Sequence, residues 1–297
     1  MIYLFLSILL VILSPLAAQV SSEASIKCGF AYRKTRKISL PSRPALPIHL
    51  DTQHFRIWYD TTGYNATTPE YANKVAQSAE YSYQIEVDLL GYPPPLPDSS
   101  ICEGRTNVGG DDRTDIYILE LGGRYFGESL PEDPCDTIPW QCPGFMKIDN
   151  DYLEPNYGYQ DNPIEALKVT VAHEFFHLIQ FGIDSEEDIW WMEATAVYME
   201  DIVYDEVNDY ISYLPDFFDY PEIPLNSTSG AEQHIYGAVV FPKFLQKYIG
   251  DEIIKDIWME CGEYGVNSVD AISRVTELES TFQEFALWNL FTGSRAD

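Results

Sequence analysis

Residues 162–198 have the sequence NPIEALKVTVAHEFFHLIQFGIDSEEDIWWMEATAVY, which holds the strongest structural signals of the chain. Asn162 is a favourable helix N-cap, and Pro163 suits the first helical turn. Glu165 stands at a capping-box position, and Gly182 stands where a helix-terminating glycine is common. These signals predict a long helix that begins after Asn162 and ends near Gly182.

The predicted helix carries the motif His173-Glu174-Phe175-Phe176-His177. Residues four apart lie on one face of a helix, so His173 and His177 can direct two imidazoles at one tetrahedral ion. Glu174 is offset by about 100° around the helix, which lets its carboxylate reach a metal-bound water without ligating the metal. The motif therefore predicts one zinc ion per chain, with Glu174 as the general base.

A catalytic zinc ion takes a third protein ligand and keeps one position for water. Glu193 is the expected ligand, because it lies in an apolar helix predicted over about 190–201, where a carboxylate is costly unless it is paired or bound to a metal. The alternative is that Glu193 only caps or pairs with a neighbouring helix. The other carboxylates are less suitable. Glu186, Glu187 and Asp188 lie in the polar segment between the two predicted helices, and Glu200 lies two turns beyond Glu193.

The segments 172–180 and 191–196 resemble the gluzincin zinc peptidases, in which a glutamate on the next helix completes the site. Three further segments resemble an exported bacterial group described as metalloproteases: residues 54–63, the Gly-Tyr-Pro-Pro-Pro run at 91–95, and residues 236–237 with 241–250. This likeness implies a zincin-like fold and a secreted, zinc-dependent peptidase acting on protein or peptide substrates. By analogy with such folds, the strand 144–149 is expected to be the edge that pairs with an extended substrate.

The sequence departs from the gluzincin pattern in two places. The interval from His177 to Glu193 is shorter than in thermolysin-like members, and Val197 stands where those enzymes place an aspartate. Support for the ligating imidazoles must then come from another residue, for which Glu200 or Asp201 is the candidate.

Gluzincins also use a donor from a later helix to stabilise the oxyanion. Tyr236 is the preferred candidate here and His234 the second, although a buried tyrosine is often only part of the core.

Two other function classes stay open: a binding module in which zinc has only a structural role, and a zinc hydrolase of a non-peptide bond. An intact Glu174 argues against the first, because a structural site has no need of a general base.

The fold class expected is α+β, with a mixed lobe over about 51–182 and a mainly helical lobe over about 183–297. In the first lobe, alternating residues predict strands at 54–59, 115–121 and 145–149, with a helix from Pro69 to Leu90 and a long loop between the last two strands. In the second lobe, helical patterns cover about 230–249, 251–260 and 280–291. The resembling proteins continue past residue 297, which leaves open whether this chain is a fragment.

Before the first lobe, residues 2–13 are almost entirely apolar and small residues follow to Ala18. This pattern predicts a secretory signal peptide over 1–18, with a membrane anchor as the alternative, and no later segment predicts a membrane span. Residues 19–50 are then a linker or pro-segment. It holds a third of the basic residues, and it either lies across an acidic cleft or forms an extended lead-in strand.

The formal charge is −29, from 47 acidic and 18 basic residues, which disfavours nucleic-acid binding. Calcium binding by clustered carboxylates is a weaker expectation, because no cluster matches an EF-hand loop. The clusters are Asp149 with Asp151, the four acidic residues of 184–188, and residues 200–209.

The chain has five cysteines and no C-x-x-C pair: Cys28, Cys102, Cys135, Cys142 and Cys261. In an exported protein they favour disulfides of undetermined pairing, and the odd number leaves one thiol over.

Overall fold

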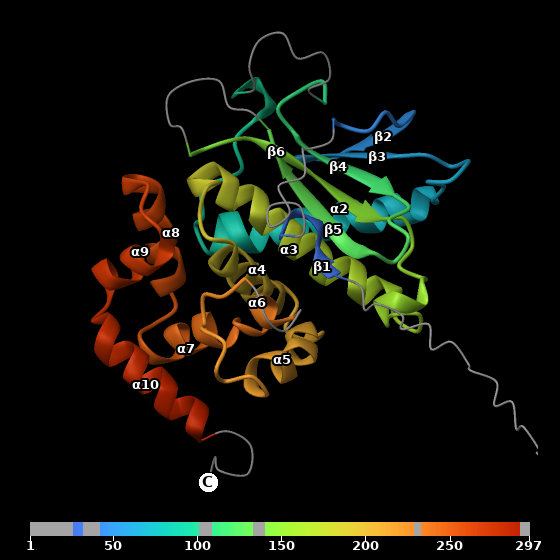
Figure 1. The fold of residues 1–297 in the computed structure, drawn as a ribbon. Coiled ribbons are helices and arrows are strands. Elements are labelled where there is room, and N and C mark those ends of the chain that lie inside the picture. Colours follow the sequence, from blue (N-terminus) through green and yellow to red (C-terminus); the bar gives the residue numbers. More distant parts are fainter. Residues whose placement is uncertain (1–25, 32–41, 101–108, 133–139, 229–232, 292–297) are drawn as a thin grey trace, which may run out of the picture.

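A computed structural model of the chain describes residues 26–31, 42–100, 109–132, 140–228 and 233–291. The fold is α+β: a six-stranded mixed sheet lies against two helices, and the remaining helices extend from them toward the C-terminus (Figure 1). The predicted signal peptide lies outside the described residues, as do Cys102 and Cys135.

The sheet has the strand order β1-β5-β6-β4-β3-β2. Its strands are β1 (Ile26–Cys28), β2 (Ile48–Asp51), β3 (Phe55–Tyr59), β4 (Thr114–Leu119), β5 (Tyr125–Pro131) and β6 (Gly144–Asp149). The inner strands β3, β4 and β6 run parallel to one another. Strand β2 is antiparallel to β3, β5 is antiparallel to β6, and β1 is parallel to β5. Strand β6 is therefore interior, and the expectation that 144–149 is a free edge is wrong.

Strand β5 is a second correction, because the sequence pattern predicts a continuous loop between β4 and β6. Its residues YFGESLP include a glycine, a glutamate and a proline, which are poor signals for a strand. Tertiary pairing compensates: Glu128 lies opposite Lys147 in the register, and their side chains form a buried ion pair at 3.3 Å. The strand lies over the long helix α3, and this position brings it to the candidate site.

Helix α3 (Pro163–Asp184) follows the predicted start, although the Asn162 side chain makes no capping bond. It runs two residues past Gly182, which is an ordinary interior residue here. Almost every side chain from Ala166 onward is buried, because the sheet, α2 (Pro69–Tyr83), α4 (Ile189–Val203) and α8 (Ile253–Tyr264) surround it. A helix packed on all sides can hold polar residues only where they find partners.

The first-lobe helix ends differently from its prediction: α2 gives way to a π-helical turn over Gln84–Leu89 before Gly91. The predicted helix over 230–249 is also two helices, α6 (His234–Gly237) and α7 (Val240–Tyr248), and 230–232 lie outside the described residues. Pro242 has no N–H to bond back to Ala238, and this lost hydrogen bond disfavours one continuous helix. The other helices are α5 (Leu214–Phe218), α9 (Ser268–Val275) and α10 (Leu278–Leu290).

Two basic residues tie the segment before the first lobe to the core. The Nζ of Lys27 lies 2.8 Å from Asp209 and 3.1 Å from Glu200. Arg43 forms a buried ion pair with Asp98 at 2.7 Å.

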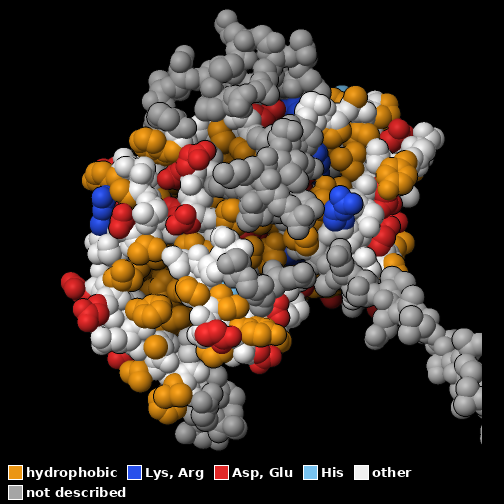
Figure 2. Space-filling model, in the orientation of Figure 1, with side chains coloured by type: hydrophobic (Ala, Val, Ile, Leu, Met, Phe, Trp, Pro, Cys, Tyr) orange, Lys and Arg blue, Asp and Glu red, His pale blue; other side chains and the backbone are white. Residues whose placement is uncertain are grey.

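The surface of the molecule carries more acidic than basic side chains. On the face seen in Figure 2, acidic side chains are widespread and basic ones are few, as the net charge requires. Within the described residues, no helix is both long and apolar enough to cross a bilayer.

Candidate metal centre

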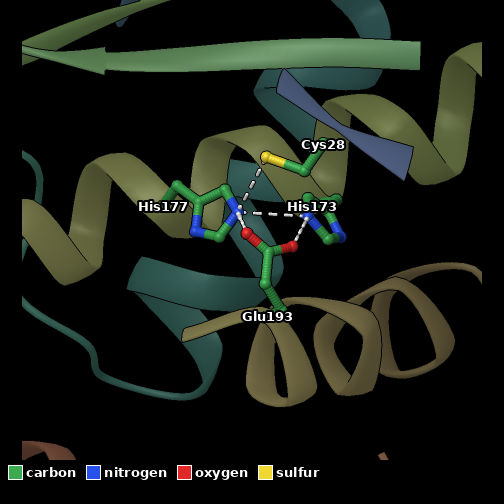
Figure 3. A group of neighbouring side chains, drawn as sticks. All are labelled: Cys28, His173, His177 and Glu193. Carbon is green, nitrogen blue, oxygen red and sulfur yellow. Dashed lines mark hydrogen bonds and ion pairs between the residues drawn. The ribbon is translucent and has the colours of Figure 1, made fainter. Parts of the chain in front are cut away.

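Three predicted ligands meet between α3 and α4. His173 and His177 extend from α3, and Glu193 rises from α4 between them (Figure 3). The Nε2 atoms of the two histidines are 3.1 Å apart. The carboxylate of Glu193 places one oxygen 3.2 Å from His173 Nε2 and the other 3.4 Å from His177 Nε2. All three side chains are fully buried.

These separations fit a tetrahedral zinc ion. Two nitrogen or oxygen ligands at about 2.0–2.1 Å from such an ion lie about 3.3–3.4 Å from each other. The separation of 3.1 Å between the two Nε2 atoms is close to one edge of that tetrahedron, and the Glu193 carboxylate places one oxygen near each nitrogen, at 3.2 and 3.4 Å. The residues present therefore offer the donor atoms that zinc takes and could hold a metal ion.

The outer nitrogens of the two imidazoles have fixed partners. His173 Nδ1 lies 2.7 Å from a carboxylate oxygen of Glu200, and His177 Nδ1 lies 2.7 Å from the amide oxygen of Gln180. The Gln180 amide is oriented by its NH₂ group, which donates to the carbonyl of Met192 and to Thr195 Oγ1. Both Nδ1 atoms therefore act as donors, which leaves the Nε2 lone pairs directed into the group. Facing lone pairs and a carboxylate repel one another unless a cation lies between them.

The electrostatics of the group also favour a cation. Burial lowers the pKa of His173, but hydrogen bonds to Glu193 and Glu200 outweigh it and raise that pKa to about 10. Burial raises the pKa of Glu193, but His177 and His173 lower it to about 2. Glu193 is thus ionised at neutral pH, and its field favours positive charge at His173. A metal ion supplies that charge while leaving both rings neutral.

Glu174 lies beside the ligands and is also fully buried. Its backbone carbonyl accepts a hydrogen bond from Ser129 Oγ on β5 at 2.8 Å. The carboxylate oxygen Oε1 has no hydrogen-bond partner among the described residues. Burial raises the pKa of Glu174, and the two histidines only partly oppose this. An unpaired buried carboxylate is costly, and such groups are common where chemistry is performed.

A fourth ligand atom comes from β1. Cys28 Sγ lies 3.4 Å from His177 Nε2 and 3.9 Å from the Glu174 carboxylate, and Figure 3 shows it facing the other three side chains. The four residues Cys28, His173, His177 and Glu193 have ligand atoms within 4.8 Å of one another. Burial, Glu174 and Glu193 raise the pKa of Cys28 well above its ordinary value. Cys28 and Cys261 are not in disulfides.

The two candidate oxyanion donors lie in different surroundings. Tyr236 is buried, and its hydroxyl accepts a hydrogen bond of 3.2 Å from the backbone N–H of Cys28, beside the ligand group. His234 has Nε2 3.1 Å from the Pro224 carbonyl, and its ring stacks on Phe217. The structure thus brings Tyr236 to the group and gives His234 partners elsewhere.

Glu200 and Asp201, the two candidates for supporting the imidazoles, also have different partners. Glu200 contacts His173, as described above, and its second oxygen pairs with Lys27. Asp201 instead forms an ion pair with Lys243. Glu200 therefore links the ligand His173 to the cation of β1.

The acidic clusters considered for calcium have structural partners. Asp149 forms a group with Glu120 and Glu154, but its two oxygens already accept four hydrogen bonds, including one from Tyr157. Asp209 accepts bonds from Tyr159 and Tyr213 and pairs with Lys27, and Glu187 accepts two backbone N–H groups. Calcium binding stays a prediction.

Sequence reasoning gave no role to Gln180, Cys28 or Lys27. Gln180 had a signal, since it lies three residues after His177 on the same helical face. For Cys28 and Lys27, the only signal in the sequence was that their segment is basic and contains a cysteine.

No family model, no curated protein and no solved structure matches this chain.

Proposed function

We propose that this chain is an exported zinc peptidase of zincin-like fold. The proposal rests on the meeting of His173, His177 and Glu193, with separations of 3.1, 3.2 and 3.4 Å between their nitrogen and oxygen atoms and with the unpaired Oε1 of Glu174 beside them. The export part rests on the apolar residues 2–13 and the small residues that follow them.

Each residue near the group has a part in hydrolysis. Zinc held by His173, His177 and Glu193 would polarise the scissile carbonyl and acidify a coordinated water. Glu174 would take the proton from the attacking water and pass it to the leaving amine, and burial raises its pKa, which makes it a stronger base. The Tyr236 hydroxyl donates to the developing oxyanion. Glu200 and Gln180 hold the two imidazoles in orientation.

The position of β5 supports an extended peptide as substrate. In the register, Cys28 on β1 lies opposite Gly127 on β5, and the Cys28 side chain reaches the ligand group. A strand paired with β5 can therefore present its residues to the group. Backbone pairing with a sheet edge recognises peptides by their main chain, largely independently of side-chain identity.

A structural zinc site is the second candidate, because Cys28 completes a set of four ligands as closed sites require. Glu174 distinguishes the two. A closed site leaves Glu174 without a function, although it is buried and Oε1 is unpaired at a cost of about 1–3 kcal/mol. Under the peptidase proposal, the same carboxylate is the base.

Metal removal and replacement test the proposal. The protein, with its natural sequence and with Cys28→Ser, is stripped with a zinc chelator and then reloaded with one equivalent of Zn²⁺. We expect hydrolysis of unfolded casein by the loaded Cys28→Ser protein, loss of activity on stripping and recovery on reloading. A stripped protein as active as the reloaded one contradicts the proposal, and so does a loaded Cys28→Ser protein that is folded yet inactive on casein.

A further inference from the structure

Residues 26–31 cover the metal centre. Beyond the Cys28 thiol, the ring of Phe30 packs on His177 at 5.5 Å between centroids and on Phe181 at 5.1 Å. With this segment in place, His173, Glu174 and Glu193 have no solvent exposure at all. A substrate cannot reach a base and ligands that are completely buried.

We propose that residues 26–31 are an inhibitory segment, in which the Cys28 thiolate is the fourth zinc ligand and excludes the catalytic water. This inference rests on the proposed function. A zinc–sulfur bond is about 2.3 Å long, which places a thiolate about 3.5 Å from a nitrogen ligand on the same tetrahedral ion. The observed distance from Cys28 Sγ to His177 Nε2 is 3.4 Å.

The same segment occupies the edge where a substrate strand would pair. Strand β1 pairs with β5 in parallel, with Ile26 opposite Tyr125 and Cys28 opposite Gly127. The N–H of Ile26 donates to the carbonyl of Arg124 at 2.9 Å. Because the backbone groups of an edge strand can pair with one neighbour only, a peptide cannot bind to β5 until β1 has left it.

The segment also engages residues that serve the reaction. Tyr236, the proposed oxyanion donor, accepts the hydrogen bond from the Cys28 N–H. Glu200, which orients His173, forms an ion pair with Lys27, and Asp209 completes the acidic site around that ammonium group. The inhibitory segment thus occupies the water position, the substrate edge and the oxyanion donor together.

Activation is a ligand exchange without a change of redox state. The zinc–sulfur bond breaks, a water molecule takes the position that the sulfur leaves, and the thiolate takes up a proton from solvent. Displacement of residues 26–31, by cleavage of the chain or by a competing ligand for Cys28, completes the exchange.

Cobalt substitution tests the ligand directly, independently of activity. The full chain, Cys28→Ser and Cys261→Ser are each loaded with one equivalent of Co²⁺. Cys261 is a matched control, because it is a buried thiol in α8 outside the ligand group. We expect the near-ultraviolet thiolate-to-cobalt absorption in the natural sequence and in Cys261→Ser, and its loss in Cys28→Ser. Its absence from the natural sequence, or its persistence in Cys28→Ser, overturns the proposal.

Activity of the zinc-loaded proteins tests the inhibition. Cys28→Ser is expected to hydrolyse a quenched peptide at least about tenfold faster than the natural sequence and Cys261→Ser. Serine is a much weaker zinc ligand than a thiolate, so residues 26–31 lose one of their attachments and leave β5 more often. Equal activity of Cys28→Ser and the natural sequence overturns the inhibition. If Cys28→Ser loses the cobalt band, is folded by circular dichroism and shows no hydrolysis, the peptidase function fails while thiolate ligation stands. Cys28→Ala repeats both measurements should the serine variant not fold.

Discussion

Gln180 fixes which nitrogen of His177 faces the ligand group. Its amide oxygen accepts from His177 Nδ1, while its NH₂ group donates to Met192 and Thr195. Gln180→Leu keeps the volume and removes the acceptor, so we expect zinc affinity to fall by about 10- to 100-fold. Competition with a fluorescent chelator measures this. Gln160→Leu, at an exposed position, is the control, and equal affinity for both variants contradicts the role given to Gln180.

Tyr236 is expected to act in the transition state only. In a Cys28→Ser background, Tyr236→Phe removes the hydroxyl and should lower kcat by about 10- to 1000-fold, while zinc content stays at one per chain. Tyr71→Phe is the matched control, since the Tyr71 hydroxyl donates to the Asp149 carbonyl instead. His234→Ala should have a smaller effect than Tyr236→Phe. A larger effect at His234 would assign the donor role to that residue.

At the scale of elements, β5 and α3 approach each other through Gly127. A Cβ at this position would lie 2.7 Å from atoms of both Glu174 and Thr170, closer than side chains pack. Gly127→Ala must push the strand from the helix, so we expect a loss of about 1–3 kcal/mol in the free energy of unfolding. Urea denaturation measures it.

Gly182→Ala is the control for this change. Gly182 is inside α3, and the atom nearest to an added Cβ is 3.6 Å away. Alanine should therefore be neutral or should stabilise the helix by up to about 1 kcal/mol. If the two variants are equally stable, the close packing of β5 on α3 is not the reason for a glycine at position 127.

Elements could be predicted from the sequence where local signals agreed with the tertiary environment. Helix α3 has its proline in the first turn and a run free of breakers, so its start was predicted, and β3, β4 and β6 follow the apolar patterns of their residues. Strand β5 could not be predicted, because its Glu128 is stabilised by Lys147 from another strand. The break between α6 and α7 could have been anticipated from Pro242, which disfavours a continuous helix.

The same distinction applies to the site. His173 and His177 were predicted together from their spacing on one helix, and Glu193 was predicted because its carboxylate lies in the apolar helix that follows. Cys28 is 149 residues from His177 along the chain, and only the pairing of β1 with β5 shows that its sulfur lies among the ligands. Glu200 was one of two candidates because both carboxylates follow Glu193 on α4.

At the scale of the whole molecule, the acidic surface opposes the compact state. With a formal charge of −29, long-range repulsion is greatest at low ionic strength, where the Debye length is about 30 Å at 0.01 M. Raising NaCl to about 0.5 M should therefore raise the Tm of the zinc-loaded protein by a few degrees. Scanning calorimetry at constant pH measures this, with an isosmotic sucrose series as the control. A Tm that falls with salt would show that attractive ion pairs dominate.

We propose that this chain holds one zinc ion and uses Glu174 as the base for hydrolysis. The most direct test compares Cys28→Ser with the double variant Cys28→Ser/Glu174→Gln, measuring zinc per chain and peptide hydrolysis on the same samples. Gln keeps the shape of Glu174 but cannot take the proton, so we predict one zinc in both proteins and a loss of at least about 100-fold in kcat in the double variant. Equal hydrolysis by the two proteins, or a loss of zinc with Glu174→Gln, would contradict the account.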